Sequence, residues 1–172
     1  MFEGLKKKYI DYQISKIWKN QNRSKQFINW NDVKSVMIIY DQATLKKETK
    51  DYVISKLNGR QFFFWTSVES SEMKKETVNT FMVSPKDTNL LNKPKDDVVK
   101  RFLNVQCDIL IDLTLTENLP LKYLTAVSKS KCKCGLAKDD DNLLDFKIQL
   151  SKGNVKDLFD QIIHYLEIIK TK

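Results

Sequence analysis

The apolar and polar residues of the chain separate into short apolar runs and longer periodic segments. Three runs are short, almost continuously apolar and rich in β-branched or aromatic side chains: SVMIIYD (35–41), QFFFWTS (61–67) and CDILIDLTL (107–115). Runs of this length and composition are typical of strands buried on both faces of a parallel sheet. We therefore predict three strands, of which the first is buried on both faces.

Other segments carry apolar residues three or four positions apart, which predicts amphipathic helices. Such helices are expected within residues 2–20, 44–59, 89–104, 119–130 and 154–169. Residues suited to helix ends support these limits. They are Thr44, Asn118 and Asn154 as N-caps, Pro94 at a helix start, and Gly59 as a stop.

Three weaker strands complete the pattern, at residues 78–84, 131–137 and 143–150. In the second, KCKCG, alternation places the two cysteines on one face and Lys131 and Lys133 on the other. We expect a strand near a sheet edge with its lysines outward. The third follows an acidic connection, so a hairpin with the preceding strand is possible.

Strands that alternate with helices predict a three-layer α/β sandwich. We expect one domain over residues 1–172, with a mostly parallel, Rossmann-like or flavodoxin-like sheet and a possible antiparallel edge strand. If the strand order is the common 3-2-1-4-5, the first and fourth strands are neighbours.

Composition narrows the class of protein. With 41% hydrophobic and 30% charged residues, the chain is neither disordered nor membrane-embedded. No apolar run approaches the roughly 20 residues of a spanning helix, and the N-terminus lacks the features of a signal peptide. Three cysteines without an export signal indicate free thiols in a reducing cytoplasm.

Positive charge is concentrated at the N-terminus. The net charge is +8, and residues 1–34 contain eight basic and three acidic side chains, a net of +5. A basic helix could contact nucleic acid or an anionic membrane surface. The alternative, which the width of its apolar stripe favours, is a helix packed on the sheet with solvated lysines. Nucleic acid is disfavoured because the chain has few arginines.

Two kinds of site are disfavoured by residue types and spacing. A zinc site would need several of Cys107, Cys132, Cys134 and His164, yet one-residue spacing is unusual and Cys107 belongs to another strand. None of the four glycines begins a glycine-rich turn before a helix, which argues against a phosphate-binding loop of that kind. No metal site of Cys and His is expected.

Carboxylates and hydroxyls at strand ends offer a better candidate. Ligands of open α/β sheets bind beyond the carboxyl ends of the strands, where the strand order reverses. A ligand crevice is therefore expected among Asp41, Thr66, Ser67, Ser84, Asp112 and Thr114. The two aspartates could hold Mg²⁺ or act as acid and base. Alternatively, Asp41 helps to cap the following helix and Asp112 accepts backbone or side-chain hydrogen bonds.

Some segments resemble known families. IIYDQAT is similar to the first motif of haloacid-dehalogenase-like phosphatases, although Ala43 stands where they have a second aspartate, which argues against that activity. SVMIIYD, the segment CDILIDLTLTENLPLKYLTAVSKSKCKCG and LLDFKIQL together resemble an uncharacterised family of Bacteroidota proteins, which implies no activity. A weaker likeness is to the N-terminal half of heptosyltransferase-type glycosyltransferases, whose sugar-nucleotide site lies largely in a second domain.

These observations predict a fold but no defined reaction. We expect a cytoplasmic α/β domain that binds a small molecule or a protein partner at the carboxyl ends of its strands. One alternative is a Mg²⁺-assisted phosphate-ester or nucleotide enzyme that uses Asp41 and Asp112. Another is a nucleic-acid or membrane-surface contact through the N-terminal helix. Catalysis, cofactor and oligomeric state are left open.

Overall fold

A single parallel sheet organises the molecule. The computed structural model describes residues 2–70, 79–138, 142–150 and 153–170. The strand order is β3-β2-β1-β4-β5-β6, and every pairing is parallel. The strands are β1 (Ser35–Asp41), β2 (Gln61–Ser67), β3 (Thr80–Val83), β4 (Ile109–Asp112), β5 (Cys132–Leu136) and β6 (Phe146–Ile148). The first five strands therefore have the common 3-2-1-4-5 order that the ligand-crevice hypothesis assumed.

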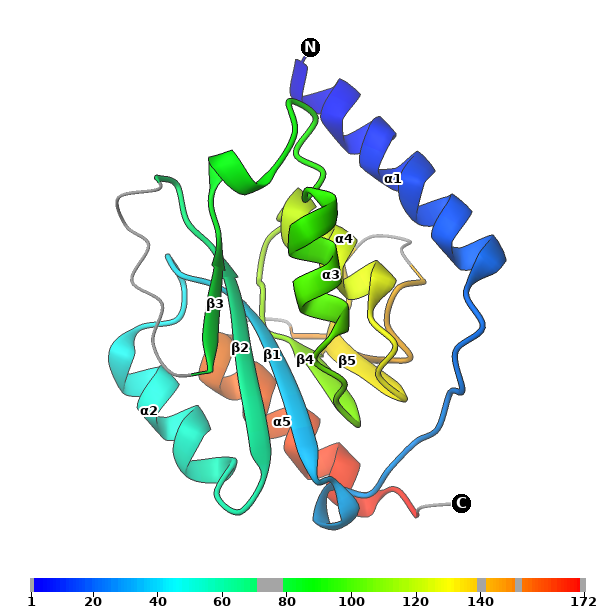
Figure 1. Cartoon of the computed structure of the whole chain (residues 1–172). Helices are drawn as coiled ribbons and strands as arrows, with labels where there is room; N and C mark the ends of the chain where they lie inside the picture. Colours follow the sequence, from blue (N-terminus) through cyan, green and yellow to red (C-terminus); the bar gives the residue numbers. More distant parts are fainter. Residues whose placement is uncertain (1, 71–78, 139–141, 151–152, 171–172) are drawn as a thin grey trace.

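Helices cover both faces of this sheet, as Figure 1 shows. They are α1 (Phe2–Asn20), α2 (Lys47–Lys56), α3 (Asp96–Leu103), α4 (Leu119–Val127) and α5 (Val155–Ile168). Side chains of α2 and α5 pack in one core, and those of α1, α3 and α4 pack in the other. The predicted three-layer α/β sandwich is confirmed. None of the described helices is both long enough and apolar enough to span a bilayer.

Helix starts follow the capping chemistry in part. The Asn118 side chain accepts a hydrogen bond from the Leu121 amide, and Asn154 forms a capping box at the start of α5. Thr44 was expected to cap α2, but that prediction is wrong. Its hydroxyl donates to the Asp41 carbonyl in the turn after β1, and α2 begins three residues later.

The last strand differs from the possible antiparallel edge. β6 runs parallel to β5, with Cys134 opposite Phe146. The connection between the strands is long enough to return the chain to the start of β5, and Leu143 and Leu144 are buried on that return. A tight hairpin would leave these leucines without a core. Residues 139–141 of the acidic connection lie outside the described residues.

The expectation of outward lysines on β5 is wrong for Lys133, which is only 1% exposed. β5 is an inner strand, flanked by β4 and β6, and helices cover both of its faces. The Lys133 Nζ donates to the Ala126 carbonyl at the end of α4, 3.1 Å away. In a strand covered on both sides, alternation separates two cores and does not separate inside from outside.

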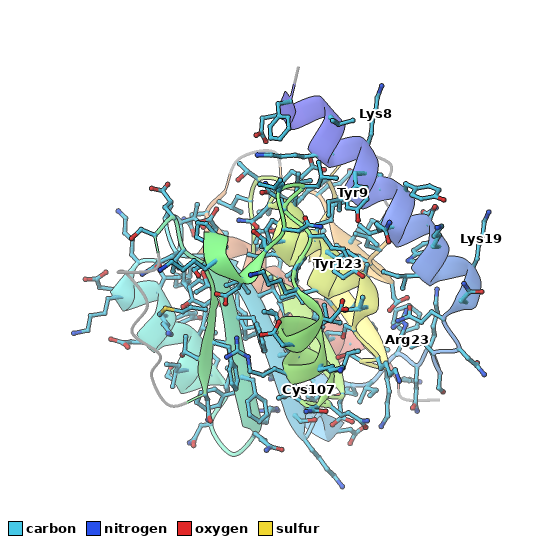
Figure 2. All side chains as sticks on the ribbon, turned by 45° about the horizontal axis from the view of Figure 1, so that its top comes forward. Lys8, Tyr9, Lys19, Arg23, Cys107 and Tyr123 are labelled. Carbon is cyan, nitrogen blue, oxygen red and sulfur yellow. The ribbon has the colours of Figure 1, made fainter. Side chains whose placement is uncertain are left out.

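Residues 21–26, here called the strap, connect α1 to the body of the molecule. The Arg23 guanidinium makes two hydrogen bonds with the Asp145 carboxylate, at 2.8 and 2.6 Å, and both side chains are buried. The side-chain amide of Gln21 donates to backbone carbonyls at the end of α4. The backbone amide of Gln26 donates to the Lys131 carbonyl. Figure 2 shows Arg23 where the chain leaves α1. The strap fixes α1 beside α4.

Candidate functional site

A cavity of about 810 Å³ lies at the carboxyl ends of β4 and β5. Its walls come from α1, from the loop between β4 and α4, from α4 itself, and from the connection between β5 and β6. Its described lining residues are Lys7, Asp11, Ile14, Ser15, Trp18, Asp112, Thr114, Leu115, Thr116, Glu117, Asn118, Lys122, Thr125, Leu136, Ala137, Lys138, Asn142, Leu143 and Leu144.

Close packing of β4 against β5 sets the floor of the cavity. Gly135 lies opposite Asp112 in the parallel register. A Cβ on Gly135 would lie 2.8 Å from the Asp112 carbonyl oxygen and 2.9 Å from a Leu144 methyl group. Only glycine therefore allows the two strands and the β5–β6 connection to approach this closely. The strands then end together, and their following loops diverge around the cavity.

Asp112 is the centre of one polar group in the cavity. Its Oδ1 accepts hydrogen bonds from the Thr114 amide at 2.9 Å and from the Thr114 hydroxyl at 2.6 Å. Its Oδ2 accepts from the Lys138 Nζ at 3.3 Å, and that ammonium also contacts the Thr114 hydroxyl. Both carboxylate oxygens thus have protein partners. The group fixes the loop after β4 against the end of β5.

Lys122 on α4 is the centre of a second polar group. Its Nζ donates to Asp11 of α1 at 2.9 Å and to Glu117 at 3.0 Å, and Glu117 also pairs with Lys7 at 3.1 Å. Burial alone would lower the pKa of Lys122, but the hydrogen bonds to Asp11 and Glu117 outweigh it and raise that pKa. Lys122 is therefore a fixed cation that joins α1 to α4.

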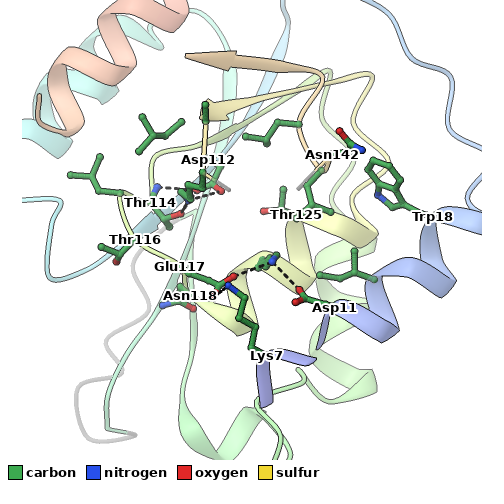
Figure 3. Close-up of a pocket in the computed structure, with 18 of the residues that line it drawn as sticks. Lys7, Asp11, Trp18, Asp112, Thr114, Thr116, Glu117, Asn118, Thr125 and Asn142 are labelled. Carbon is green, nitrogen blue, oxygen red and sulfur yellow. Dashed lines mark hydrogen bonds and ion pairs between the residues drawn. The ribbon is translucent and has the colours of Figure 1, made fainter. Parts of the chain in front are cut away.

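Aromatic and apolar side chains form the rest of the wall. Figure 3 shows Trp18 and Asn142 at the end of the cavity opposite Thr116. The Trp18 side chain remains partly open to solvent at the rim. A flat aromatic ring beside hydrogen-bonding groups suits a ligand that has both an apolar face and polar edges.

The expected crevice residues are distributed between the cavity and other places. Asp112 and Thr114 line the cavity. Ser67 lies behind it, where its hydroxyl accepts a 2.6 Å hydrogen bond from the Asn118 amide. Asp41 is not among the described lining residues, and its Oδ1 accepts a hydrogen bond from the Ala43 amide.

The other two candidates have structural partners. Thr66 is fully buried in the core that faces α2, beside the Tyr40 hydroxyl. Ser84 caps the short turn Pro85–Asp87, and its hydroxyl donates to Asp87 at 2.7 Å. Neither residue is among the described lining residues of the cavity.

Sequence reasoning missed the wall that α1 supplies. Lys7 was interpreted as part of the solvated lysine side and Trp18 as part of the apolar stripe, and Asp11 was given no role. All three line the cavity, where Lys7 and Asp11 pair with residues of α4 and of the loop before it. One signal was present: Asp11 is the single carboxylate in the middle of a lysine-rich helix, and its spacing from Lys7 and Trp18 places all three on one helix side.

The cysteines and the histidine lie apart from the cavity lining. Cys132 and Cys134 point into the core beneath α5, with their sulfurs 3.5 Å apart, and both are buried. His164 is exposed on α5. Within the described residues, no three His, Cys, Asp or Glu side chains are grouped so that they could hold a metal ion.

Comparison with known proteins identifies a family but no activity. The model of a family of unknown function (DUF6913) matches residues 6–169, so the chain belongs to that family. No curated protein and no solved structure gives a significant match to the chain.

Proposed function

We propose that this member of the family binds a small uncharged or zwitterionic organic molecule in the cavity at the carboxyl ends of β4 and β5. The observation that carries the proposal is the cavity itself. Its volume of about 810 Å³ is within the range of small-molecule sites, roughly 300–1,000 Å³. It also lies on the side of a parallel sheet where open α/β proteins bind their ligands.

The charges of the lining favour this class of ligand. Three lysines and three carboxylates line the cavity, and they are joined in two groups, around Asp112 and around Lys122. A strongly anionic or cationic ligand would have to separate pairs that are already formed, at a cost in desolvation and lost hydrogen bonds. A molecule with hydroxyl, amide or balanced charged groups can bind at the edges of these pairs.

The rest of the lining supports a polar molecule with one apolar face. Trp18 offers a ring for stacking, and Leu136, Leu143 and Leu144 offer apolar surface. In the described part of the chain, the Thr116 hydroxyl and the Asn142 amide make no side-chain hydrogen bond, so both remain free for a ligand. A protein partner would need a broad surface, which a concave site of this kind favours less.

The magnesium-dependent alternative receives less support. Asp41 is engaged in the turn after β1, and both oxygens of Asp112 accept hydrogen bonds from Thr114 and Lys138. Mg²⁺ binding at Asp112 would require Lys138 to move away, since the metal prefers carboxylate oxygens that are free to coordinate. Hydrogen bonding that fixes the loop after β4 is the better supported role of Asp112.

Native mass spectrometry of protein purified from its natural source tests the proposal. We expect a bound organic mass above that of the 20.2 kDa chain. Ala137→Trp should occupy part of the cavity and raise the dissociation constant at least tenfold, which corresponds to about 1.4 kcal/mol and lowers the bound fraction. The matched control is Ala43→Trp, in an exposed turn outside the cavity lining, and it should retain the bound mass.

Three results would contradict the proposal. The first is a protein that carries no organic mass and shows no change in melting temperature with any member of a library of uncharged and zwitterionic metabolites. The second is an equal loss of the bound mass in the two tryptophan variants, Ala137→Trp and Ala43→Trp. The third is a bound mass of magnesium alone that disappears in Asp41→Asn. This result would support the magnesium-dependent alternative.

A further inference from the structure

The side of α1 that faces away from α4 carries positive charge and exposed apolar groups. We define the outer face of α1 as Leu5, Lys8, Tyr12, Lys16 and Lys19, which recur three or four positions apart. All five side chains are exposed, and Leu5 and Tyr12 are each 55% exposed. Figure 2 shows Lys8 and Lys19 projecting away from the body of the molecule.

The outer face contains no acidic residue. The two carboxylates of α1 lie elsewhere: Glu3 pairs with Lys6, and Asp11 pairs with Lys122 at the cavity. Within the described residues, Lys8 and Lys19 have no ion-pair partner, and Lys16 lies over the Tyr12 ring at 4.5 Å. The outer face is therefore a row of uncompensated positive charge along a helix of 19 residues.

The inner side of the same helix is already occupied. Ile10 and Ile14 are buried against α4, and the strap holds the end of the helix to the body. The exposed Leu5 and Tyr12 thus remain available while α1 stays in place. A surface that meets α1 from outside would need no unfolding of the domain.

We propose that the outer face of α1 docks this protein on an anionic membrane surface. Lysine ammonium groups attract the negatively charged headgroups, and Leu5 and Tyr12 can enter the boundary between headgroups and acyl chains. The 19-residue helix is about 28 Å long, so its three lysines contact the surface together. This inference is independent of the ligand proposed for the cavity.

The chemistry of the face favours lipid over nucleic acid. Its cations are all lysines, whereas nucleic-acid surfaces commonly use arginine for planar, two-point contacts with phosphates and bases. The exposed Leu5 side chain has no role against a phosphate backbone. At a membrane, its transfer out of water is favourable and would strengthen binding. Phe2, at the start of the helix and 56% exposed, adds a third apolar group on this side.

Vesicle co-sedimentation of the full chain tests the proposal at about 0.15 M salt. The vesicles are phosphatidylcholine alone or phosphatidylcholine with roughly 30% phosphatidylserine. We expect binding to the anionic vesicles only. Because each lysine near such a surface contributes roughly a fivefold factor, the triple variant Lys8→Glu, Lys16→Glu, Lys19→Glu should weaken binding at least about a hundredfold.

A matched control separates position from net charge. Lys46→Glu, Lys47→Glu, Lys56→Glu alters three exposed lysines at α2, on the opposite face of the sheet, and lowers the net charge equally. It should bind anionic vesicles nearly as well as the wild type. Leu5→Gln with Tyr12→Gln keeps the charge and should weaken binding severalfold, because these side chains no longer enter the membrane.

The proposal is overturned if wild type does not sediment with anionic vesicles, or if the α1 and α2 triple variants lose binding equally. It is also overturned if duplex DNA or single-stranded RNA binds the wild type more tightly than the vesicles do and if that binding disappears in the α1 variant. Circular dichroism of each variant shows whether the fold is retained. The five outer-face side chains are exposed, so retention is expected.

Discussion

Lys133 places an amine in the interior of the molecule, between β5 and the end of α4. Burial, reinforced by the nearby charge of Arg23, lowers the pKa of Lys133 to about 7, and the carboxylate of Asp145 opposes this shift only in part. The usual lysine pKa is 10.5. The unfolded chain therefore binds a proton that the folded protein releases above about pH 7, so stability should rise with pH there.

We expect the free energy of unfolding of the wild type to increase by about 2 kcal/mol between pH 7 and pH 9 through Lys133. Lys133→Met should remove this increase, while Lys131→Met, directly before β5, should keep it, because Lys131 is exposed. Urea unfolding at several pH values measures the difference. An equal slope in wild type and Lys133→Met would exclude a neutral buried amine.

The buried thiol of Cys107 opposes the rise of stability with pH at higher pH. Burial, followed by the charge of Asp108, raises the pKa of the Cys107 thiol to about 12. In the unfolded chain the thiol ionises near its usual pKa of 9, so above that value the unfolded state loses a proton that the folded state keeps. Above about pH 9 this contribution lowers stability and offsets the rise from Lys133, which itself ends near pH 10.5, where the unfolded lysine loses its proton.

Gly135 shows how one residue sets the shape of the cavity floor. Gly135→Ala would bring a Cβ against the Asp112 carbonyl and Leu144, so β4 and β5 must move apart. We expect a loss of about 1–3 kcal/mol in unfolding free energy. Gly4→Ala in α1 is the control, since an added Cβ there meets nothing within 4 Å and removes a helix-destabilising glycine.

Calorimetry or chemical denaturation distinguishes these two glycine variants. A stability of Gly135→Ala equal to that of wild type would mean that β5 can shift without cost. The cavity floor would then be adaptable, and its shape would depend less on the contact between the two strands.

At the scale of the elements, α1 is held mainly through partners that are distant in the sequence. Arg23 and Asp145 are 122 residues apart, and Asp11 and Lys122 are 111 residues apart. The hydrogen bonds of Asp145, first of all with Arg23, outweigh its burial and lower its pKa, so it stays ionised at neutral pH. The strap therefore contributes one partner of a buried ion pair, Arg23 with Asp145, and this pair joins the end of α1 to the start of β6.

Arg23→Ala should reduce the free energy of unfolding by about 3–5 kcal/mol, because it leaves the buried Asp145 carboxylate without its main partner. Lys25→Ala is the control on the same carboxylate. Its side chain is 67% exposed and 3.5 Å from Asp145, so the loss should stay below about 1 kcal/mol. If the two alanine variants are equally stable, the buried pair does not hold α1.

At the scale of the whole molecule, the sheet was predictable and the cavity was predictable only in part. The apolar runs at 35–41 and 61–67 appear in the structure as strands with those same limits, because a strand buried on both faces needs continuous apolar sequence. Asp112 and Thr114 were predicted as site residues because strand ends in parallel sheets meet at one edge.

The other wall of the cavity depends on packing between distant segments. Nothing local in α1 specifies that Asp11 meets Lys122, since either residue could equally be solvated. The direction of β6 likewise depends on the burial of Leu143 and Leu144, which becomes evident only once the neighbouring helices are placed. Periodic sequence thus predicts elements, whereas contacts over more than 100 residues decide how α1 and β6 close the site.

The sequence separation within the strap also affects how the protein is made. At about 5–20 residues per second, the ribosome needs on the order of 10 s to pass from Arg23 to Asp145. Throughout that interval Ile10 and Ile14 have no complete surface to pack on, and most of the stability of a helix in a protein comes from such packing. Nascent chains therefore display an apolar and basic segment to chaperones until β5 and the start of β6 have been synthesised.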